Sequence, residues 1–424
     1  MNILLKSAKI INAPNKELHL KKRDILIKNG RIDKIAQNIE VSGNTKRIDH
    51  KNLHISIGWF DSSVSFGEPG YEERETIVNG LHTAAKSGFT DIVLNPNTFP
   101  VPDSSSDIVF VKNASMDQAT NLHPLGSLTA KGDGVALSEL YDMNNAGAVG
   151  FYDFKRPIKN SNLLKIALQY AQNFNGLVYS FPLDYNIAGK GIVNEGPVST
   201  SLGLKGIPSL AEELQIARDL FILEYTGGKL HIPTISTENS VRLVAQAKKK
   251  GLDISCSVAI HNLVFTDTTL DEFDSMFKVM PPLRAKTDCK ALIKGLKDGI
   301  IDFVCTDHIP MNIEIKSIEF DNAAYGSIGM ESAFGALNPI FGIEMSIELL
   351  TKGRTRYNLD TPLLKEKEKA CLTIFDPEID YVFDQSDIVS SSKNSIFLGY
   401  SLKGKSLGSF NNEQLTVNGI NTNS

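Results

Sequence analysis

Cysteine is scarce in this sequence, and no two cysteines stand at a metal-binding spacing. The four cysteines are scattered between residues 256 and 371 and contain no C-x-x-C pair. Such scatter argues against a disulfide framework and against a zinc knuckle. We therefore expect a protein of the reducing cytoplasm.

Two features of more specialised proteins are also missing. Lysine and arginine number 44 against 49 aspartates and glutamates, and a net charge of -5 offers no basic face for nucleic acid. No stretch approaches the roughly 20 apolar residues of a membrane span. The N-terminal run alternates around Lys6 and Lys9, as a strand does and a signal peptide does not. We expect neither a nucleic-acid partner nor a membrane.

What is present is a long chain of ordinary globular composition. Its 424 residues are 42% hydrophobic, which suits a large domain with a satellite, or two to three domains. Residues 1–57 read as short strands with a hairpin turn at Asn29-Gly30. Short strands return from about residue 370. We predict a small β-sandwich built from both termini, residues 1–57 and 346–424.

The insert, residues 58–345, alternates apolar strands with helical segments. We predict eight strands, at 59–65, 90–97, 122–129, 147–153, 176–182, 229–236, 253–261 and 301–308. Eight strands that alternate with helices over about 250 residues favour a TIM-like (β/α)8 barrel. A doubly wound open sheet is the alternative. The predicted fold class is α/β, a TIM-like barrel with a small β-sandwich domain.

Function in such a barrel is located at the carboxyl ends of the strands. Side chains alternate along a strand with a period of two, so every second residue there faces the mouth. The candidates are Ser63, Ser65, Asn97, Asp153, Ser180, Thr234, His261, Asp307 and His308.

Short sequence blocks identify a family. They are EPG at 68–70, ETI at 75–77, PNT at 96–98, NEG at 194–196, AEE at 211–213, PPLR at 281–284, DGIID at 298–302, TDHIP at 306–310 and GMES at 329–332. With them, the chain resembles over nearly its whole length the dihydroorotases of the amidohydrolase superfamily, in the branch shared with allantoinases and hydantoinases. The resemblance implies a distorted (β/α)8 barrel, a β-sandwich from both termini, and a mechanism that needs a metal-bound hydroxide.

The metal-binding positions that the resemblance implies are altered. Where the family has histidine ligands, this chain has Ser63, Ser65, Ser180 and Thr234. A hydroxyl is a poor zinc ligand, because it lacks the imidazole lone pair and does not ionise readily. His231 should face the other side of its strand from Thr234, and we expect His231 and His261 to be structural. We predict no cofactor, although the family uses zinc.

Two acidic positions of the family persist. Asp307 matches the strand-8 acid that binds metal and shuttles protons, and Asp153 matches the strand-4 acid. Without the histidines we interpret both as vestigial. Because an unpaired carboxylate is costly in a dry barrel, we expect Asp153 to pair with Lys155 or Arg156.

The substrate contacts that the resemblance implies are partly lost. Where the family has an arginine that binds the substrate carboxylate, this chain has Gly67. Where the family has the asparagine of Asn-Pro-Pro-Leu-Arg, this chain has Met280. Loss of a bidentate guanidinium removes the main charged contact. Asn97 and His308 match substrate-contacting positions and are the candidate substrate-binding residues.

We therefore predict a catalytically degenerate dihydroorotase-like protein with a structural or regulatory role in pyrimidine biosynthesis. The resemblance suggests aspartate carbamoyltransferase as a partner, and we also expect a homodimer. One alternative is an active hydrolase, converting dihydroorotate to carbamoyl aspartate, that uses Asp153 and Asp307 with a hard cation. Another is a sensor that binds pyrimidine intermediates in the barrel mouth through Asn97 and His308.

Overall fold

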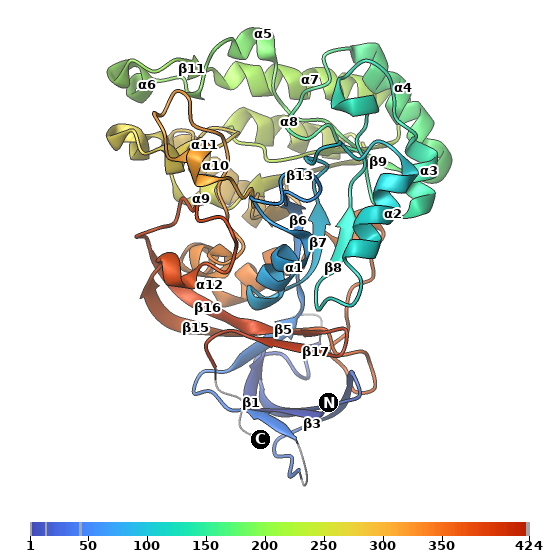
Figure 1. The fold of residues 1–424 in the computed structure, drawn as a ribbon, viewed down its shortest axis with the longest axis vertical. Coiled ribbons are helices and arrows are strands. Elements are labelled where there is room, and N and C mark those ends of the chain that lie inside the picture. The colour runs from blue at the N-terminus through green and yellow to red at the C-terminus, as the bar shows by residue number, and fades with distance from the viewer. Residues whose placement is uncertain (1, 13–14, 42–44, 421–424) are drawn as a thin grey trace.

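The computed structural model describes residues 2–12, 15–41 and 45–420, which form a helix-rich part and a β-rich part (Figure 1). The strands are β1 (Asn2–Ile10), β2 (Lys22–Lys28), β3 (Arg31–Ala36), β4 (Lys46–Ile48), β5 (His54–Ile57), β6 (Trp59–Val64), β7 (Phe89–Leu94), β8 (Asn121–Pro124), β9 (Leu177–Tyr179), β10 (Val193–Asn194), β11 (Gly206–Ile207), β12 (Lys229–Ile232), β13 (Ile254–Ala259), β14 (Phe303–Cys305), β15 (Leu372–Val382), β16 (Ser401–Asn411) and β17 (Gln414–Val417). The α-helices are α1 (Ile77–Lys86), α2 (Ser105–Ala114), α3 (Leu140–Ala146), α4 (Ser161–Ala171), α5 (Tyr185–Ala188), α6 (Pro197–Leu202), α7 (Ser209–Thr226), α8 (Glu238–Lys249), α9 (His261–Val264), α10 (Lys286–Lys297), α11 (Ile313–Lys316) and α12 (Ala333–Thr351).

The helix-rich part is a closed barrel of parallel strands. β6, β7 and β8 pair in one run, and β9, β12, β13 and β14 pair in another. Phe151 joins the two runs, because it bridges Gly126 on one side and Val178 in β9 on the other. Val64 bridges His308, beyond β14, and closes the ring. The predicted (β/α)8 barrel is confirmed, and the open sheet is wrong.

The predicted strand at 147–153 is the least regular of the eight. Its ladder is reduced to the two bridges at Phe151. Gly147 belongs to the preceding helix, since it is the C-cap of α3 with a left-handed φ of 108°. Glycine favours this cap because it has no Cβ to strain the left-handed conformation.

Aromatic side chains fill the interior of the barrel. One buried cluster includes Phe60, Tyr152, Tyr179, Phe303 and Tyr357. Because Phe60, Tyr179 and Phe303 come from β6, β9 and β14 on different sides of the ring, the cluster lies inside it. The ring of His231 stacks on Phe303 with centroids 5.3 Å apart, and its nitrogens lie 2.8 and 3.2 Å from the Ser255 and Ser257 hydroxyls. Burial lowers the pKa of His231 well below its ordinary value, so this histidine is a neutral core residue.

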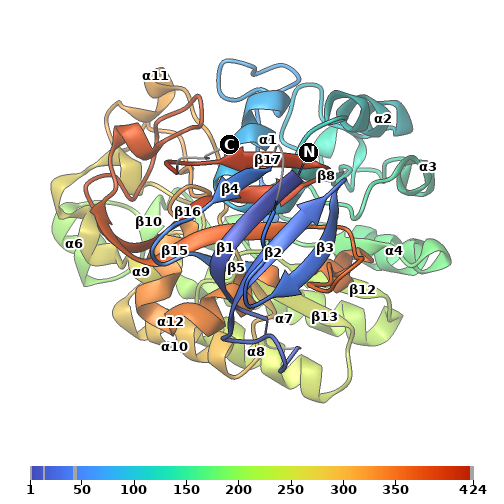
Figure 2. The ribbon, with the colours of Figure 1, turned by 90° about the horizontal axis from the view of Figure 1, so that it is seen from below.

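Both ends of the chain build the β-rich part. One eight-stranded sheet has the order β17-β16-β15-β5-β1-β2-β3, with β4 beside β1. Antiparallel pairing of β5 with β15 joins the two ends, with Ile57 opposite Leu372. Seen from below, β1 to β3 cross β15 to β17 (Figure 2). A separate hydrophobic core fills this part and includes Ile10, Ile55 and Phe410.

Helix α12 lies between the two parts. It packs on β6 and β14 of the barrel and on β15 and β16 of the sheet. The predicted boundary at 345/346 falls inside this helix, whose buried apolar residues join the core of the barrel. Among the described residues, one helical segment, Ala333–Tyr357, is long and apolar enough to cross a membrane by composition. The sequence expectation overlooked it, and its packing identifies a buried core helix.

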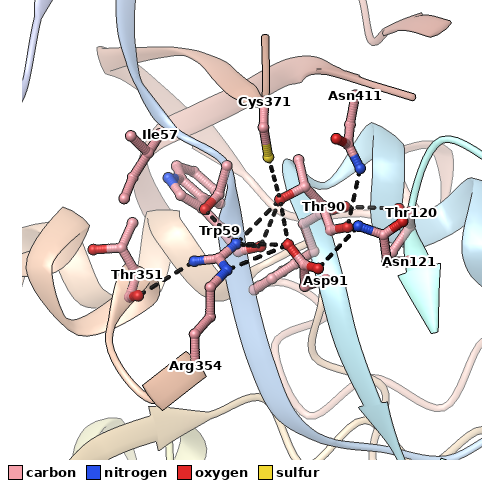
Figure 3. Close-up of polar contacts among 12 residues, drawn as sticks. Ile57, Trp59, Thr90, Asp91, Thr120, Asn121, Thr351, Arg354, Cys371 and Asn411 are labelled. Atoms are coloured by element: carbon pink, nitrogen blue, oxygen red, sulfur yellow. Dashed lines mark hydrogen bonds and ion pairs between the residues drawn. The ribbon is translucent and has the colours of Figure 1, made fainter. Parts of the chain in front are cut away.

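A buried ion pair secures the amino-terminal end of the barrel (Figure 3). Arg354 follows α12, and its Nη2 lies 2.8 Å from Asp91 Oδ2 and donates to the Gly58 carbonyl at 2.8 Å. The ring of His123 lies 3.0 Å from the other oxygen of Asp91. Burial alone would raise the pKa of Asp91, but His123 and Arg354 hold it below its usual range. The pair ties β6, β7 and β8 to the segment after α12.

Candidate functional site

A chain of hydrogen-bonded polar side chains crosses the barrel mouth. Asn95, directly after β7, donates from Nδ2 to the hydroxyls of Ser63 and Ser65, each at 3.1 Å. Ser63 donates in turn to Asp307 Oδ1 at 3.3 Å. On the far side, Lys155 Nζ lies 2.7 Å from Asp307 Oδ2. The two serines and Asp307 thus meet at one place: the Asn95 amide joins the serines, the Ser63 hydroxyl joins them to Asp307, and Lys155 pairs with Asp307.

Lys155 reaches this place from the loop after Phe151. Its φ of 53° is left-handed, which turns the chain sharply two residues after Asp153. Its Nζ also donates to the Met280 carbonyl. The side chains of Lys155 and Asp307 are 14% and 2% exposed. A carboxylate buried to this degree needs a compensating charge, and Lys155 supplies it.

Asp153 does not pair with Lys155 or Arg156, and that prediction is wrong. The Asp153 carboxylate accepts hydrogen bonds from the Ser127 hydroxyl at 2.9 Å and from the Thr129 N–H and hydroxyl at 2.9 and 2.6 Å. Arg156 donates to a backbone carbonyl instead. Burial raises the pKa of Asp153, and these hydrogen bonds oppose the rise. The loop after β8 places its donors against Asp153, so the cation is not needed there.

A further carboxylate lies below the serines. Asp61 accepts hydrogen bonds from the N–H of Ser63 at 3.1 Å and from the N–H and hydroxyl of Thr306. Burial raises the pKa of Asp61 to about 7. Asp61 therefore connects β6 to the end of β14 beneath the mouth.

Ser180 and Thr234 are not joined to the chain across the mouth. Ser180 donates to Asp219 of α7 at 2.5 Å, and Asp219 is paired with Arg218 at 2.6 Å. The Thr234 N–H donates to Ser257 at 3.2 Å, and its hydroxyl has no hydrogen-bond partner among the described residues. Two of the four positions where the resemblance implies histidine thus contact neighbouring elements, α7 and β13.

The two candidate substrate contacts lie in different surroundings. Asn97 lines a cavity of about 190 Å³, together with Asp153 and Arg156. His308 is fully buried, and its Nδ1 accepts the Gly329 N–H at 3.2 Å. Burial lowers the pKa of His308 to about 3, so its ring is neutral.

The side chains at the mouth do not fit zinc. A catalytic zinc site needs three protein ligands and an open position. The Asp307 carboxylate is paired with Lys155, and the Asp153 carboxylate accepts three hydrogen bonds. The four positions where the resemblance implies histidine carry hydroxyl groups. Across residues 2–12, 15–41 and 45–420, no group of three or more His, Cys, Asp or Glu side chains is placed to hold a metal ion.

Sequence reasoning missed Asn95 as a member of the chain across the mouth, and it assigned Lys155 to the wrong carboxylate. Asn95 stands two residues before Asn97, and the period of two was a usable signal. Lys155 stands two residues after Asp153, which suggested the wrong partner. Its left-handed φ redirects the side chain, and a lysine carries no sequence signal for that conformation.

Comparison with known proteins agrees with the fold. The family model described as Dihydro-orotase-like matches residues 54–240. The dihydroorotase of Pelotomaculum thermopropionicum is 35% identical over 95% of this chain and 96% of its own. That of Acetivibrio thermocellus is 38% identical over 90% of this chain and 91% of its own.

Solved structures show the same architecture at lower identity. L-Hydantoinase (dihydropyrimidinase) from Arthrobacter aurescens has a TM-score of 0.85 and 20% identity, covering 100% of this chain and 97% of its own. Dihydropyrimidinase from Brevibacillus agri has a TM-score of 0.79 and 18% identity, covering 98% and 95%. These likenesses concern the fold. The two dihydroorotases, in contrast, are more than one third identical to this chain over at least 90% of both sequences. The chain belongs to the dihydroorotase family of the amidohydrolase superfamily.

Proposed function

We propose that this member of the dihydroorotase family is catalytically degenerate and acts in the cytoplasm as a structural or regulatory protein of pyrimidine biosynthesis. The observation that carries the proposal is the ion pair between Lys155 and Asp307, at 2.7 Å. By resemblance, the family's acid at this position binds metal and shuttles protons. A carboxylate already held by an internal ammonium group is withdrawn from both tasks.

The energetic balance at the mouth supports the proposal. To bind zinc, Asp307 would have to release Lys155 and leave that ammonium without its carboxylate. Breaking a buried ion pair typically costs about 3–5 kcal/mol. In return, the ion would gain the hydroxyls of Ser63 and Ser65, which are weak zinc ligands. The exchange is unfavourable at both steps.

Turnover assays test the loss of catalysis. The purified protein should not hydrolyse dihydroorotate, allantoin or hydantoin faster than the Asp307→Asn variant, with Zn²⁺, Mn²⁺ or Mg²⁺ added. Hydrolysis with zinc that disappears in Asp307→Asn would overturn the proposal. Hydrolysis with Mn²⁺ or Mg²⁺ that requires both Asp153 and Asp307 would establish the alternative, a hydrolase using a hard cation.

The proposed role as a scaffold has its own test. The chain forms the closed barrel and the sheet from both termini, whereas the resemblance implies that the histidines of the mouth are replaced. We propose aspartate carbamoyltransferase of the same organism as the partner. In sedimentation velocity, an equimolar mixture at micromolar concentration should show a faster boundary than either protein alone. Independent sedimentation of the two proteins would contradict this partner and leave the site proposal untouched.

A further inference from the structure

Helix α7 carries an exposed apolar stripe. The side chains of Leu210, Leu214, Phe221 and Tyr225 are 54%, 47%, 72% and 78% exposed. At 100° per residue, these four positions and Ala217 fall within a sector of about 80° on one face of the helix. Within the described part of the chain, each of these four side chains is therefore about half exposed or more.

The face of α7 that packs on α4, α8 and β12 buries Ile216, Leu220 and Leu223 together with polar side chains such as Asp219. The helix is therefore already anchored in the fold, and the exposed stripe is not needed for that packing. On α4, which packs beside α7, Ile166 and Tyr170 are 43% and 42% exposed. Exposed apolar side chains gathered on one helix face are typical of an interaction site.

The charged residues along α7 are already paired within the chain. Arg218 turns back to Asp219 at 2.6 Å and to the Ile158 carbonyl at 2.7 Å. Glu224 is paired with Lys250 at 2.8 Å, and Glu213 accepts from Asn239 at 2.9 Å. These three charged side chains of α7 therefore already have an ion-pair or hydrogen-bond partner when another molecule covers the stripe. The stripe offers no charge for an acidic or basic partner to recognise.

The order of the side chains makes the stripe complementary to itself. Around a point between residues 217 and 218, each leucine stands at the same distance as an aromatic residue: Leu214 with Phe221, and Leu210 with Tyr225. Two antiparallel copies of α7 would therefore place each leucine opposite an aromatic ring of the other copy. Ala217, the smallest side chain of the stripe, would lie near the two-fold axis. Small residues at a crossing let two helices approach closely.

We infer that α7 is the two-fold interface of a homodimer, with Leu214 of each copy against Phe221 of the other. A hollow of about 90 Å³ between α7 and α8, lined by Ala217, Phe221 and Leu243, gives room for the partner's side chains. An interface of this kind is isologous, so one surface serves both copies. In Figure 1, α7 lies at the end away from the β-rich part, so this interface leaves the sheet uncovered. The inference does not depend on the loss of catalysis.

Light scattering after size-exclusion chromatography tests the interface. The wild-type protein should have twice the chain mass of 46.5 kDa. The L214E/F221E variant should have half the wild-type mass, because buried like charges face each other across the axis. The control V78E/V109E adds the same charge at exposed positions of α1 and α2, which are 54% and 46% exposed, and should keep the wild-type mass. Circular dichroism and thermal unfolding should match between the two variants.

A second variant tests the register. In L214E/F221K, the antiparallel pairing places unlike charges opposite each other, so the dimer should return at low salt and dissociate as salt screens the pairs. A wild-type protein of single-chain mass would overturn the inference. So would a folded L214E/F221E protein that keeps the wild-type mass, or an L214E/F221K protein that stays monomeric at low salt.

Discussion

Lys155 and Asp307 are separated by 152 positions in the chain, yet their charged groups lie 2.7 Å apart across the barrel mouth. The pair joins the fourth and eighth strand positions of the barrel. It places a positive charge beside the acid that, by resemblance, the family uses to bind metal. Asn95 and Ser63 extend the contact to the end of β6, so the first strand position is tied into the same structure.

The first prediction concerns the stability that this pair provides. Lys155→Met should lower the free energy of unfolding by about 3 kcal/mol, because it leaves the Asp307 carboxylate buried without a counterion. Urea unfolding followed by circular dichroism measures the change. In Lys155→Met/Asp307→Asn most of the loss should be recovered, since no buried charge remains. A loss below about 0.5 kcal/mol in Lys155→Met would show that the pair is not formed in solution.

The second prediction concerns restoring the lost ligands. S63H/S65H should bind zinc weakly, because Lys155 still neutralises Asp307 and repels the ion. Adding Lys155→Ala should tighten zinc binding by at least tenfold, since the carboxylate becomes available. Competition with a chromogenic chelator measures both affinities. Equal affinities with and without Lys155→Ala would show that Lys155 does not occupy the metal position.

The third prediction concerns acid. Burial lowers the pKa of His261 to about 4, below its ordinary 6.5. Between these two values the unfolded chain binds more protons than the native chain. The stability due to a neutral His261 is therefore complete above pH 6.5 and is lost as pH falls toward about 4. Free energies of unfolding across this range should rise less steeply with pH in His261→Gln, by the slope of one proton.

Asp61 provides a control of opposite sign. Burial raises the pKa of Asp61 from 3.8 to about 7, so the native chain binds the extra proton in the same range. Its contribution to stability is present at low pH and is lost as pH rises toward 7. Asp61→Asn should therefore steepen the rise that His261→Gln flattens. Identical slopes in the two variants would contradict the assignment of these groups.

The fourth prediction concerns the opposite end of the barrel. Arg354→Met should lower the free energy of unfolding by about 3–5 kcal/mol, because Asp91 and the strand carbonyls lose a donor that is 1% exposed. Lys294→Ala is the matched control, since its pair with Asp298 is 75% exposed on the lysine side. An exposed pair of this spacing contributes about 0.3–0.5 kcal/mol. Similar losses in both variants would contradict the structural role of Arg354.

The sequence predicted the barrel well, because the apolar strands and intervening helices have the right number and spacing. Where a strand is long and buried, as β6, β7 and β13 are, the predicted segment and the observed one overlap closely. The segment at 147–153 was overestimated because Gly147 caps α3. The boundary at 345/346 was misplaced because it divides α12, whose buried residues on both sides of that point belong to the core of the barrel.

The partners of individual side chains at the mouth could not be predicted in the same way. Sequence distance favoured Asp153 as the partner of Lys155, whereas the backbone turn at Lys155 and the donors of Ser127 and Thr129 decided otherwise. Which partner a side chain takes at the mouth depends on the backbone dihedral angles of the loops, and these loops bring together residues that are far apart in the sequence. Ser63, Ser65 and Asp307 were all predicted at the mouth, and they lie together there because they follow the neighbouring first and eighth strands.

The most direct test is a crystal structure of the protein grown with zinc, with anomalous data collected above the zinc absorption edge. We predict no anomalous peak at the barrel mouth, and density for Lys155 Nζ within hydrogen-bonding distance of Asp307. A zinc peak coordinated by Asp307, with the Lys155 side chain displaced, would contradict the account.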